Sequence, residues 1–341
     1  SGNVKLTKIM IFYKGLLGKL SILLFVCGVL VLYLTIQSIA QRRAPGGGPE
    51  PQRADNRMFG EDKLVVIYNR IPKTGSTTFM GVAYDLCKVN GFHAIHVNVS
   101  KNSHILSVDG QLDLVKNISL WEEKKPVIYH GHISYIDFQR FGFKTQPIYI
   151  NIVREPLERF ISYFYFLRYG DDFRPHLTRR KKGDKMTFDD CVVKGKEECN
   201  PDNLWLQVPY FCGQHAECLI PGSKWALERA KSNLVSQYLL VGITEDIRTF
   251  ISMIESSLPT LFKGATKLFD KGDKSHLRKT AKKFNPSKDT LSIIRQSNVY
   301  QMERDFYEFA QAEFEHQKKI YLRFQQLPEL YHYEKIKPNK P

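Results

Sequence analysis

The sequence lacks several features that would place it outside the ordinary globular proteins. It has six cysteines in 341 residues, too few for a dense disulfide scaffold, and no internal repeat or collagen-like glycine pattern. A hydrophobic content of 43% excludes intrinsic disorder of the whole chain, because that many apolar side chains can build a core. It has no Asp-x-Asp triplet, which argues against a metal-dependent glycosyltransferase, and no Gly-x4-Gly-Lys-Ser/Thr motif of the P-loop nucleotide hydrolases.

Acidic residues are also scarce relative to basic ones. Lysine and arginine number 50 against 35 aspartates and glutamates, which gives a formal net charge of +15. A surplus of this size favours a polyanionic partner, namely nucleic acid, a membrane surface or an acidic polysaccharide. Charge alone does not choose among the three.

One long apolar run stands near the N-terminus. Residues 20–36 are uncharged and almost wholly apolar, and four lysines with no acidic residue precede them. We therefore predict a cytosolic tail over residues 1–19 and a transmembrane signal-anchor over 20–36, with the rest of the chain in an oxidising lumen. A signal peptide cleaved near Ser38-Ile39-Ala40 is the alternative, and the length of the run favours the anchor. The Gly- and Pro-rich residues 37–60 predict a flexible stem, and residues 61–341 a folded lumenal domain.

The cysteine spacing agrees with an oxidising compartment. Cys191 and Cys199 are eight residues apart, and Cys212 and Cys218 are six apart. In a lumen this spacing predicts two short-loop disulfides, 191–199 and 212–218. A zinc site of four thiolates is the alternative, but the spacings miss the usual two- to four-residue gaps.

Three further positions bear on the same compartment. Asn98 and Asn117 each begin an N-glycosylation sequon, a motif that is used in secreted and lumenal proteins. Cys87 stands alone in an apolar helical pattern, which predicts a buried free thiol.

Runs of β-branched and aromatic residues alternate with helical patterns in the folded domain. They predict strands at residues 63–69, 94–99, 127–130, 147–153 and 238–242. We also expect a helix from Glu155-Pro156 to about residue 168, short helices around the cysteine pairs, and a long helix over residues 299–324. This alternation predicts an α/β fold with an open, mostly parallel sheet that binds its ligands at the carboxyl ends of the strands.

The loop after the first strand is the strongest chemical signal. Residues 70–78 read Arg-Ile-Pro-Lys-Thr-Gly-Ser-Thr-Thr and lead into a helical pattern. The backbone N–H groups of this turn, the hydroxyls of Ser76, Thr77 and Thr78 and the charge of Lys73 form a candidate anion cradle. The alternative is an ordinary strand-to-helix turn with a capping Ser or Thr.

A second candidate anion site follows the fourth strand. Arg154 stands at the end of that strand, and Ser162 lies about two turns into the next helix. An arginine and a hydroxyl at the same sheet edge suit a second phosphate. The alternative is a salt bridge between Arg154 and Glu158.

The third constellation is a histidine pair at the end of the third strand. His130 and His132 are two residues apart, so we expect both rings on one side of the strand, facing the same crevice. A metal-ligand role lacks an obvious third ligand in the sequence. A histidine beside an anion cradle is better interpreted as a general base.

Together these segments resemble a known family. The motifs IPKTGSTTF and IVREPLERFISYF, with the predicted type II topology, resemble the Golgi carbohydrate sulfotransferases. Within that family, YHGHISY, FLRYGDDFRP, WLQVPYFCG and SHLRKT resemble the heparan sulfate 2-O-sulfotransferases over about residues 64–338. The uronyl 2-O-sulfotransferases of chondroitin and dermatan sulfate share residues 211–215 but differ in the first loop and the histidine segment, so they stand second.

The resemblance implies a P-loop-like three-layer α/β fold and a metal-free sulfuryl transfer. The donor would be 3′-phosphoadenosine 5′-phosphosulfate (PAPS), and the acceptor the 2-hydroxyl of hexuronic acid, mainly iduronic acid, in heparan sulfate. The resemblance also implies a homotrimer in the Golgi membrane.

The same resemblance assigns roles to residues of this chain. The 5′-phosphosulfate loop would be Lys73, Thr74, Gly75, Ser76, Thr77 and Thr78, and the 3′-phosphate site Arg154 and Ser162. Arg278 and Thr280 belong to a segment, residues 275–280, that closes over the nucleotide. His132 would be the base, with His130 in support and Lys73 neutralising the leaving oxygen. Arg70, Tyr84, Arg174 and Arg179 would contact the acceptor.

Two basic clusters, residues 174–182 and 271–283, agree with an acidic polysaccharide as partner. Nucleic acid is the usual partner of such clusters, but a lumen holds none. A catalytically silent heparan-binding lectin is an alternative of a different class. Intact Lys73 and His132 argue against it.

Overall fold

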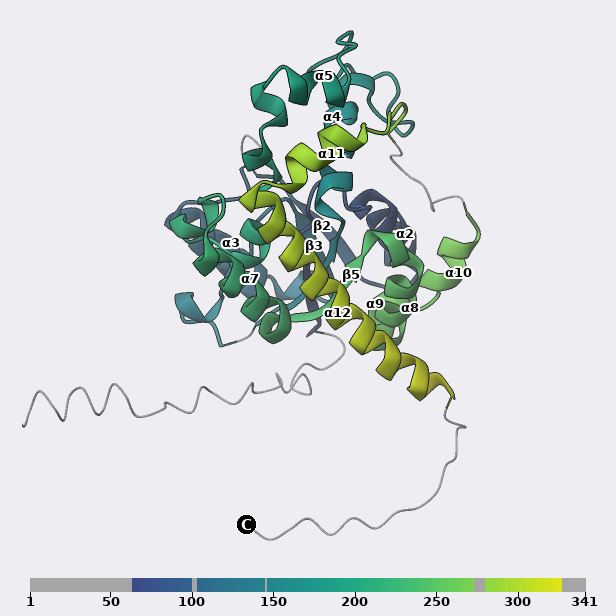
Figure 1. Ribbon diagram of the computed structural model, residues 1–341. Coiled ribbons are helices and arrows are strands. Elements are labelled where there is room, and N and C mark those ends of the chain that lie inside the picture. The colour runs from purple at the N-terminus through teal and green to yellow at the C-terminus, as the bar shows by residue number, and fades with distance from the viewer. Residues whose placement is uncertain (1–62, 100–102, 145, 273–279, 327–341) are drawn as a thin grey trace, which may run out of the picture. The chain divides into compact units, whose positions relative to one another are not determined.

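Five parallel strands form the sheet of the computed structural model, which describes residues 63–99, 103–144, 146–272 and 280–326 (Figure 1). They are β1 Val65–Tyr68, β2 His93–Val97, β3 Val127–Gly131, β4 Ile148–Val153 and β5 Tyr238–Ile243, in the order β2-β3-β1-β4-β5. The central strands β1 and β3 are buried along their whole length, as expected for apolar runs covered on both faces of a parallel sheet.

Aromatic side chains pack against one face of this sheet from three helices. Phe79 of α2 (Ser76–Val89) contacts Tyr68 of β1 edge-on, with ring centroids 5.1 Å apart. The Phe79 ring also meets Phe250 of α8 (Ile247–Ser257) and Phe262 of α9 (Pro259–Phe262). This aromatic cluster fixes the position of α2, the helix that follows the first loop.

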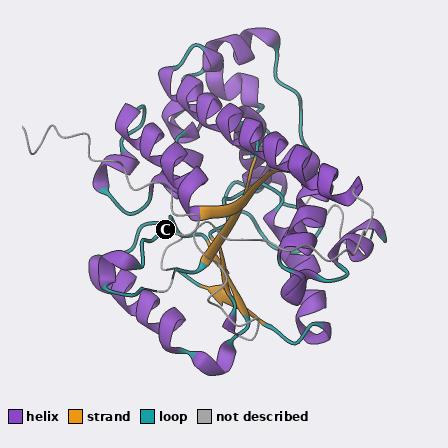
Figure 2. Ribbon diagram, turned by 90° about the horizontal axis from the view of Figure 1, so that it is seen from below, coloured by secondary structure: helices purple, strands orange, loops and turns teal. Residues whose placement is uncertain are grey.

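Other helices cover the opposite face. Phe211 of α6 (Gln207–Cys212) lies 4.6 Å from the ring of Tyr238 and 4.9 Å from that of Phe306 in α12 (Asn298–Gln326). Figure 2 shows helices on both sides of the strands, and Figure 1 shows α12 running across the sheet. The described residues therefore form an α/β fold with a parallel sheet between helices.

The remaining elements complete the connections between these layers. The other α-helices are α3 Val108–Leu120, α4 Pro156–Tyr169, α5 Phe188–Val193, α7 Lys224–Gln237, α10 Ala265–Asp270 and α11 Lys288–Arg295. Short 3-10 turns are η4 Glu122–Lys124, η5 Gln139–Phe141, η6 Glu197–Cys199, η7 Pro201–Leu204, η8 Ala216–Leu219 and η9 Thr244–Asp246.

The five strands and both principal helices expected from the sequence are confirmed. Their ends lie within two residues of the predicted ends. Helix α4 begins at Pro156, and the side chain of Glu155 accepts a hydrogen bond from the Glu158 N–H as its cap. Helix α3 was not expected. It contains Gly110 and the weak helix formers of the second sequon, and the hydroxyl of Ser107 caps its first turn.

The predicted tail, anchor and stem, residues 1–60, lie outside the described residues. Within residues 63–326, excepting the short gaps, no helix is long and apolar enough to span a bilayer.

Both predicted disulfides are confirmed. Cys191 is bonded to Cys199, and Cys212 to Cys218. The expectation of a buried thiol at Cys87 is wrong in degree: the side chain is only partly buried, because it lies near the C-terminus of α2, and its thiol donates to the Tyr84 carbonyl.

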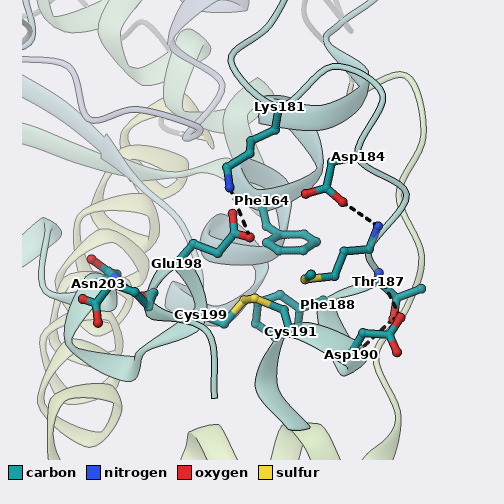
Figure 3. Close-up of a disulfide and its surroundings, with 12 residues drawn as sticks. Phe164, Lys181, Asp184, Thr187, Phe188, Asp190, Cys191, Glu198, Cys199 and Asn203 are labelled. Atoms are coloured by element: carbon teal, nitrogen blue, oxygen red, sulfur yellow. Dashed lines mark hydrogen bonds and ion pairs between the residues drawn. A yellow bond between two sulfur atoms is a disulfide. The ribbon is translucent and has the colours of Figure 1, made fainter. Parts of the chain in front are cut away.

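Figure 3 shows the first disulfide, Cys191–Cys199, with Glu198, Asp184 and Phe164 among the surrounding side chains. A buried arginine, Arg168, organises this region. The guanidinium of Arg168 bonds Glu198 at 2.6 Å and Asp184 at 2.9 Å, and it lies 3.6 Å above the ring of Phe164. Arg168 belongs to α4, Glu198 to the disulfide loop, and Asp184 to the segment after α4. The arginine thus ties α4 to the basic segment that carries Arg174 and Arg179.

We predict that Arg168→Leu lowers the free energy of unfolding by about 3 kcal/mol, because it leaves two carboxylates facing an apolar side chain. Chemical denaturation of the folded domain measures this. Limited trypsin digestion should also cut the segment 179–185 faster. Arg180→Leu, a change at an exposed arginine of the same segment, is the control for stability and should leave the free energy of unfolding unchanged. Equal stability of the two variants would contradict the role given to Arg168.

Candidate active site

The strand order brings three sequence segments to one edge of the sheet. Strand β1 pairs with β3 through Tyr68 opposite His130, and with β4 through Tyr68 opposite Ile150. The loop after β1, the histidines after β3 and Arg154 after β4 therefore emerge side by side. This is the edge where parallel α/β sheets bind ligands.

The loop between β1 and α2 has the geometry of an anion cradle. Lys73 and Gly75 both have left-handed backbones, with φ of 70° and 80°. Helix α2 starts at Ser76 with Gly75 as its N-cap and no side-chain cap. The alternative of a turn capped by Ser or Thr therefore has no support, and the amide end of α2 is left for an anion.

A threonine from a distant part of the chain holds this loop in place. The hydroxyl of Thr244 lies 3.1 Å from the carbonyl of Thr74 and 3.0 Å from that of Val153. A β-carbon added at Gly75 would stand 3.2 Å from the side chain of Ile247. The loop thus has little room to shift, and Gly75 has both a conformational and a steric reason to lack a side chain.

Lys73 reaches from the loop towards α4. Its ammonium lies 3.3 Å from the hydroxyl of Thr280 and 4.3 Å from the centre of the Phe166 ring. Its carbonyl accepts a hydrogen bond from Arg154 at 3.3 Å. The same Thr280 hydroxyl is 3.3 Å from that of Ser162. One threonine therefore connects both candidate phosphate sites.

Arg154 takes part in the salt bridge considered as its alternative role. Its guanidinium lies 3.5 Å from the Glu158 carboxylate, which also accepts from Lys283 at 2.5 Å. The Arg154 side chain nevertheless stays 22% exposed. A partly exposed arginine held by one carboxylate remains able to bind a phosphate as well.

The backbone of Arg154 is clasped by a residue that the sequence did not point to. The side chain of Gln207 accepts from the Arg154 N–H at 3.0 Å and donates to its carbonyl at 2.9 Å. Gln207 is the first residue of α6. The N–H groups of Leu206, which precedes the helix, and of Val208 both donate to one oxygen of Glu303. Glu303 lies on α12 and is fully buried, and this burial raises the pKa of its carboxyl.

His132 has a defined tautomer. Its Nδ1 lies 2.8 Å from the carbonyl of Arg70, and a carbonyl accepts, so Nδ1 carries the proton. Nε2 is then the basic nitrogen of the neutral ring. The same bond places His132 against the residue that precedes the anion cradle. The ring is therefore oriented as a general base requires.

His130 is far more buried than a residue facing a crevice. Its side chain is 1% exposed; its Nε2 lies 2.7 Å from the hydroxyl of Tyr84, and its ring stacks on His96 at 4.8 Å. Burial, with the nearby positive charge of Arg70, lowers the pKa of His130 to about 3. His130 is thus too buried to face an open crevice, and it contacts Tyr84 and His96 as a neutral ring.

His96 was not anticipated as a member of this cluster. Its Nε2 accepts from the Arg70 guanidinium at 3.2 Å. His96 joins the cluster because β2 pairs with β3 and sets His96 opposite His130. The sequence alone does not give this register. Within the described residues no group of three or more His, Cys, Asp or Glu side chains is placed to hold a metal ion.

The four predicted acceptor residues lie in two groups. Arg70 and Tyr84 flank the histidines, and Tyr84 is 47% exposed. Arg174 and Arg179 follow α4: Asp171 accepts from the Arg174 N–H at 2.8 Å and from the Arg179 guanidinium at 3.1 Å. Asp171 is itself buried and forms an isolated antiparallel bridge with Thr280. Arg174 and Arg179 are thus tied, through Asp171, to Thr280, which contacts Lys73.

Three further predicted sites are less central. Arg278 lies outside the described residues. Asn98, just after β2, and Asn117, in α3, are both exposed, as a glycosylated asparagine must be.

Comparisons with known proteins agree with this geometry. A family model described as "Sulfotransferase family" matches residues 56–310. Heparan sulfate 2-O-sulfotransferase 1 of Mus musculus is 51% identical over 280 residues, 82% of this chain and 78% of the relative. The protein of the same name from Homo sapiens is 50% identical over the same shares. Heparin sulfate O-sulfotransferase of Drosophila melanogaster is 50% identical over 82% of this chain and 80% of its own length.

The depressed pKa of His130 makes folding pH-dependent. In the unfolded chain this histidine takes up a proton below about pH 6.5, whereas the folded protein keeps it neutral down to about pH 3. Stability therefore falls as the pH drops between these values, by up to about 1.4 kcal/mol per pH unit from this group. We predict that His130→Gln flattens the decline of unfolding free energy measured by urea titration from pH 7 to 4.5. An unchanged slope would rule out His130 as a source of acid lability.

Proposed function

The chain belongs to the sulfotransferase family, and from this premise we propose that it is a heparan sulfate 2-O-sulfotransferase. It transfers a sulfuryl group from PAPS to the 2-hydroxyl of hexuronic acid, mainly iduronic acid, in heparan sulfate. The observation that carries the proposal is the bond from His132 Nδ1 to the Arg70 carbonyl, which holds a basic nitrogen beside an anion cradle.

The donor fits the two anion sites at the sheet edge. The N-terminus of α2, with Lys73, Thr74, Gly75, Ser76, Thr77 and Thr78, would hold the 5′-phosphosulfate, in a loop that serves as the counterpart of a P-loop. Arg154 and Ser162 would hold the 3′-phosphate. Thr280 lies between the two sites, and Arg278 would add charge from the preceding segment.

The acceptor's hydroxyl needs a base, because a sugar hydroxyl is a poor nucleophile. Nε2 of His132 takes its proton as the oxygen–sulfur bond forms. Negative charge then develops on the oxygen that leaves with the nucleotide, and the ammonium of Lys73 stabilises it in the transition state. His130 and His96 keep Arg70 and Tyr84 in position around the acceptor.

The acceptor polymer would lie across the two groups of predicted acceptor residues, which comprise three arginines and a tyrosine. Arg70, Tyr84, Arg174 and Arg179 contact the uronic acid and its neighbours, since arginine binds carboxylate and sulfate in a bidentate manner. We further propose the settings implied by the sequence: a type II protein of the Golgi membrane, acting in the lumen as a homotrimer.

Product analysis tests the substrate. Incubated with PAPS and 2-O-desulfated heparan sulfate, the lumenal domain is expected to yield disaccharides with 2-O-sulfated iduronic acid. Dermatan and chondroitin sulfate, used in parallel, should accept far less sulfate. Preferred sulfation of those two polymers would reassign the enzyme to the uronyl 2-O-sulfotransferases. Binding of heparan sulfate without any transfer would mean a lectin.

Two substitutions separate the roles of the proposed catalytic residues. His132→Ala is expected to lower the transfer rate by ~10²–10⁴-fold, the usual contribution of a general base, while binding of 3′,5′-phosphoadenosine stays near normal. Lys73→Ala should damage both, because its ammonium contacts the donor in the ground state and in the transition state. Transfer assays and calorimetric nucleotide titration measure the two quantities.

The wild-type protein and a double His132→Ala, Lys73→Ala variant complete this comparison. Near-normal turnover of His132→Ala, or loss of nucleotide binding as complete as in Lys73→Ala, would show that His132 is not the base.

A further inference from the structure

One aromatic ring lies between the proposed donor site and the proposed acceptor site. The centre of the Phe166 ring is 4.3 Å from the ammonium of Lys73 and 4.4 Å from the guanidinium carbon of Arg179. Both distances are well within the range of a cation–π contact. None of the roles assigned above includes Phe166.

The position of Phe166 on its helix explains how it reaches both cations. It stands four residues after Ser162 in α4, so the two side chains share one face of the helix, and that face looks onto the site. The next residues of the helix are anchored by the buried Arg168 and its two carboxylates. The ring is therefore carried by a rigid element.

The hydrogen bonds of the two cations leave room for a further contact to orient them. Lys73 Nζ lies at 3.3 Å from the Thr280 hydroxyl, a long hydrogen bond. Arg179 donates to Asp171 at 3.1 Å through one terminal nitrogen, whereas its buried Nε has no hydrogen-bond partner among the described residues. The face of the Phe166 ring supplies a further point of contact to both cations, and this contact restrains their direction.

We propose that Phe166 is a positioning residue that aligns Lys73 with Arg179. The ring keeps Lys73 and Arg179 at a fixed distance from each other. Lys73 stabilises the leaving oxygen of the donor, and Arg179 binds the acidic groups of the acceptor. This inference rests on the proposed sulfuryl transfer, and it adds a residue through which the two substrate sites are kept in register.

Two positive charges, those of Lys73 and Arg179, contact the same side chain. Two like charges contacting one side chain repel each other, and partial burial strengthens the repulsion. The negative face of an aromatic ring offsets part of this cost, whereas an aliphatic side chain of similar volume offers nothing to either cation. An aromatic residue is therefore required here for electrostatic reasons in addition to packing.

The test replaces the ring while keeping the apolar volume. Phe166→Leu and Phe166→Met remove the aromatic face, and Phe166→Tyr retains it. Tyr163→Leu, a change at an exposed aromatic on the same helix, is the matched control. Each variant is assayed for binding of 3′,5′-phosphoadenosine, for binding of a heparan sulfate oligosaccharide, and for kcat and KM of transfer.

The aliphatic variants are expected to bind each ligand about threefold to tenfold more weakly, the range that one or two cation–π contacts represent. Phe166→Tyr and Tyr163→Leu should remain near wild type. The decisive measurement is a pair of double-mutant cycles. In a Lys73→Ala background, Phe166→Leu should no longer weaken nucleotide binding. In an Arg179→Ala background it should no longer weaken oligosaccharide binding.

Full, additive losses in both backgrounds would overturn the proposal, because the ring would then act through packing alone. Wild-type affinity of Phe166→Leu and Phe166→Met for both ligands would overturn it as well. Failure of the proposed function is distinguished by the wild-type protein. If it binds both ligands but transfers no sulfate, the proposed function is wrong, and the double-mutant cycles on ligand binding still test the role of Phe166.

Discussion

Strand β1 is hydrogen-bonded to β3 on one side and to β4 on the other, and the candidate site depends on this pairing. The three strands end at the same edge, so the cradle loop, the histidines and Arg154 meet although they are separated by tens of residues in the chain. A buried polar network secures the middle of this edge. Asn151 donates to the carbonyl of Asn69, whose own amide donates to the Tyr238 hydroxyl. Because a slip in register would leave these groups unpaired inside the protein, the network specifies where each strand ends.

At this edge of the sheet, residues far apart in the sequence contact each other and form the candidate site. Thr244 bridges the cradle loop and the end of β4, and Thr280 bridges Lys73 and Ser162. Asp171 joins Arg174 and Arg179, two of the predicted acceptor residues, to the isolated β-bridge at Thr280. The proposed donor and acceptor sites therefore share supporting residues, which is a structural basis for keeping two substrates aligned.

Local patterns made much of this architecture predictable. The apolar runs predicted all five strands, and the cysteine spacing predicted both disulfides, since each depends on residues near each other in sequence. The roles of Gln207 and His96 were not predictable in the same way. Gln207 acts across more than fifty residues, and His96 joins the cluster only through the pairing of β2 with β3. His130 likewise contacts Tyr84, a neighbour that two-residue periodicity does not reveal.

The two hydrogen bonds from the side chain of Gln207 to the backbone of Arg154 affect the order in which parts of the fold can form during synthesis. Helix α6 is held at its start by Glu303, which belongs to the last described helix, so the backbone of the candidate 3′-phosphate arginine is braced by a residue made about 150 positions later. During synthesis the central strands can pair long before this carboxylate leaves the ribosome. All five strands therefore precede, in the order of synthesis, the carboxylate that braces α6 and, through Gln207, the backbone of Arg154.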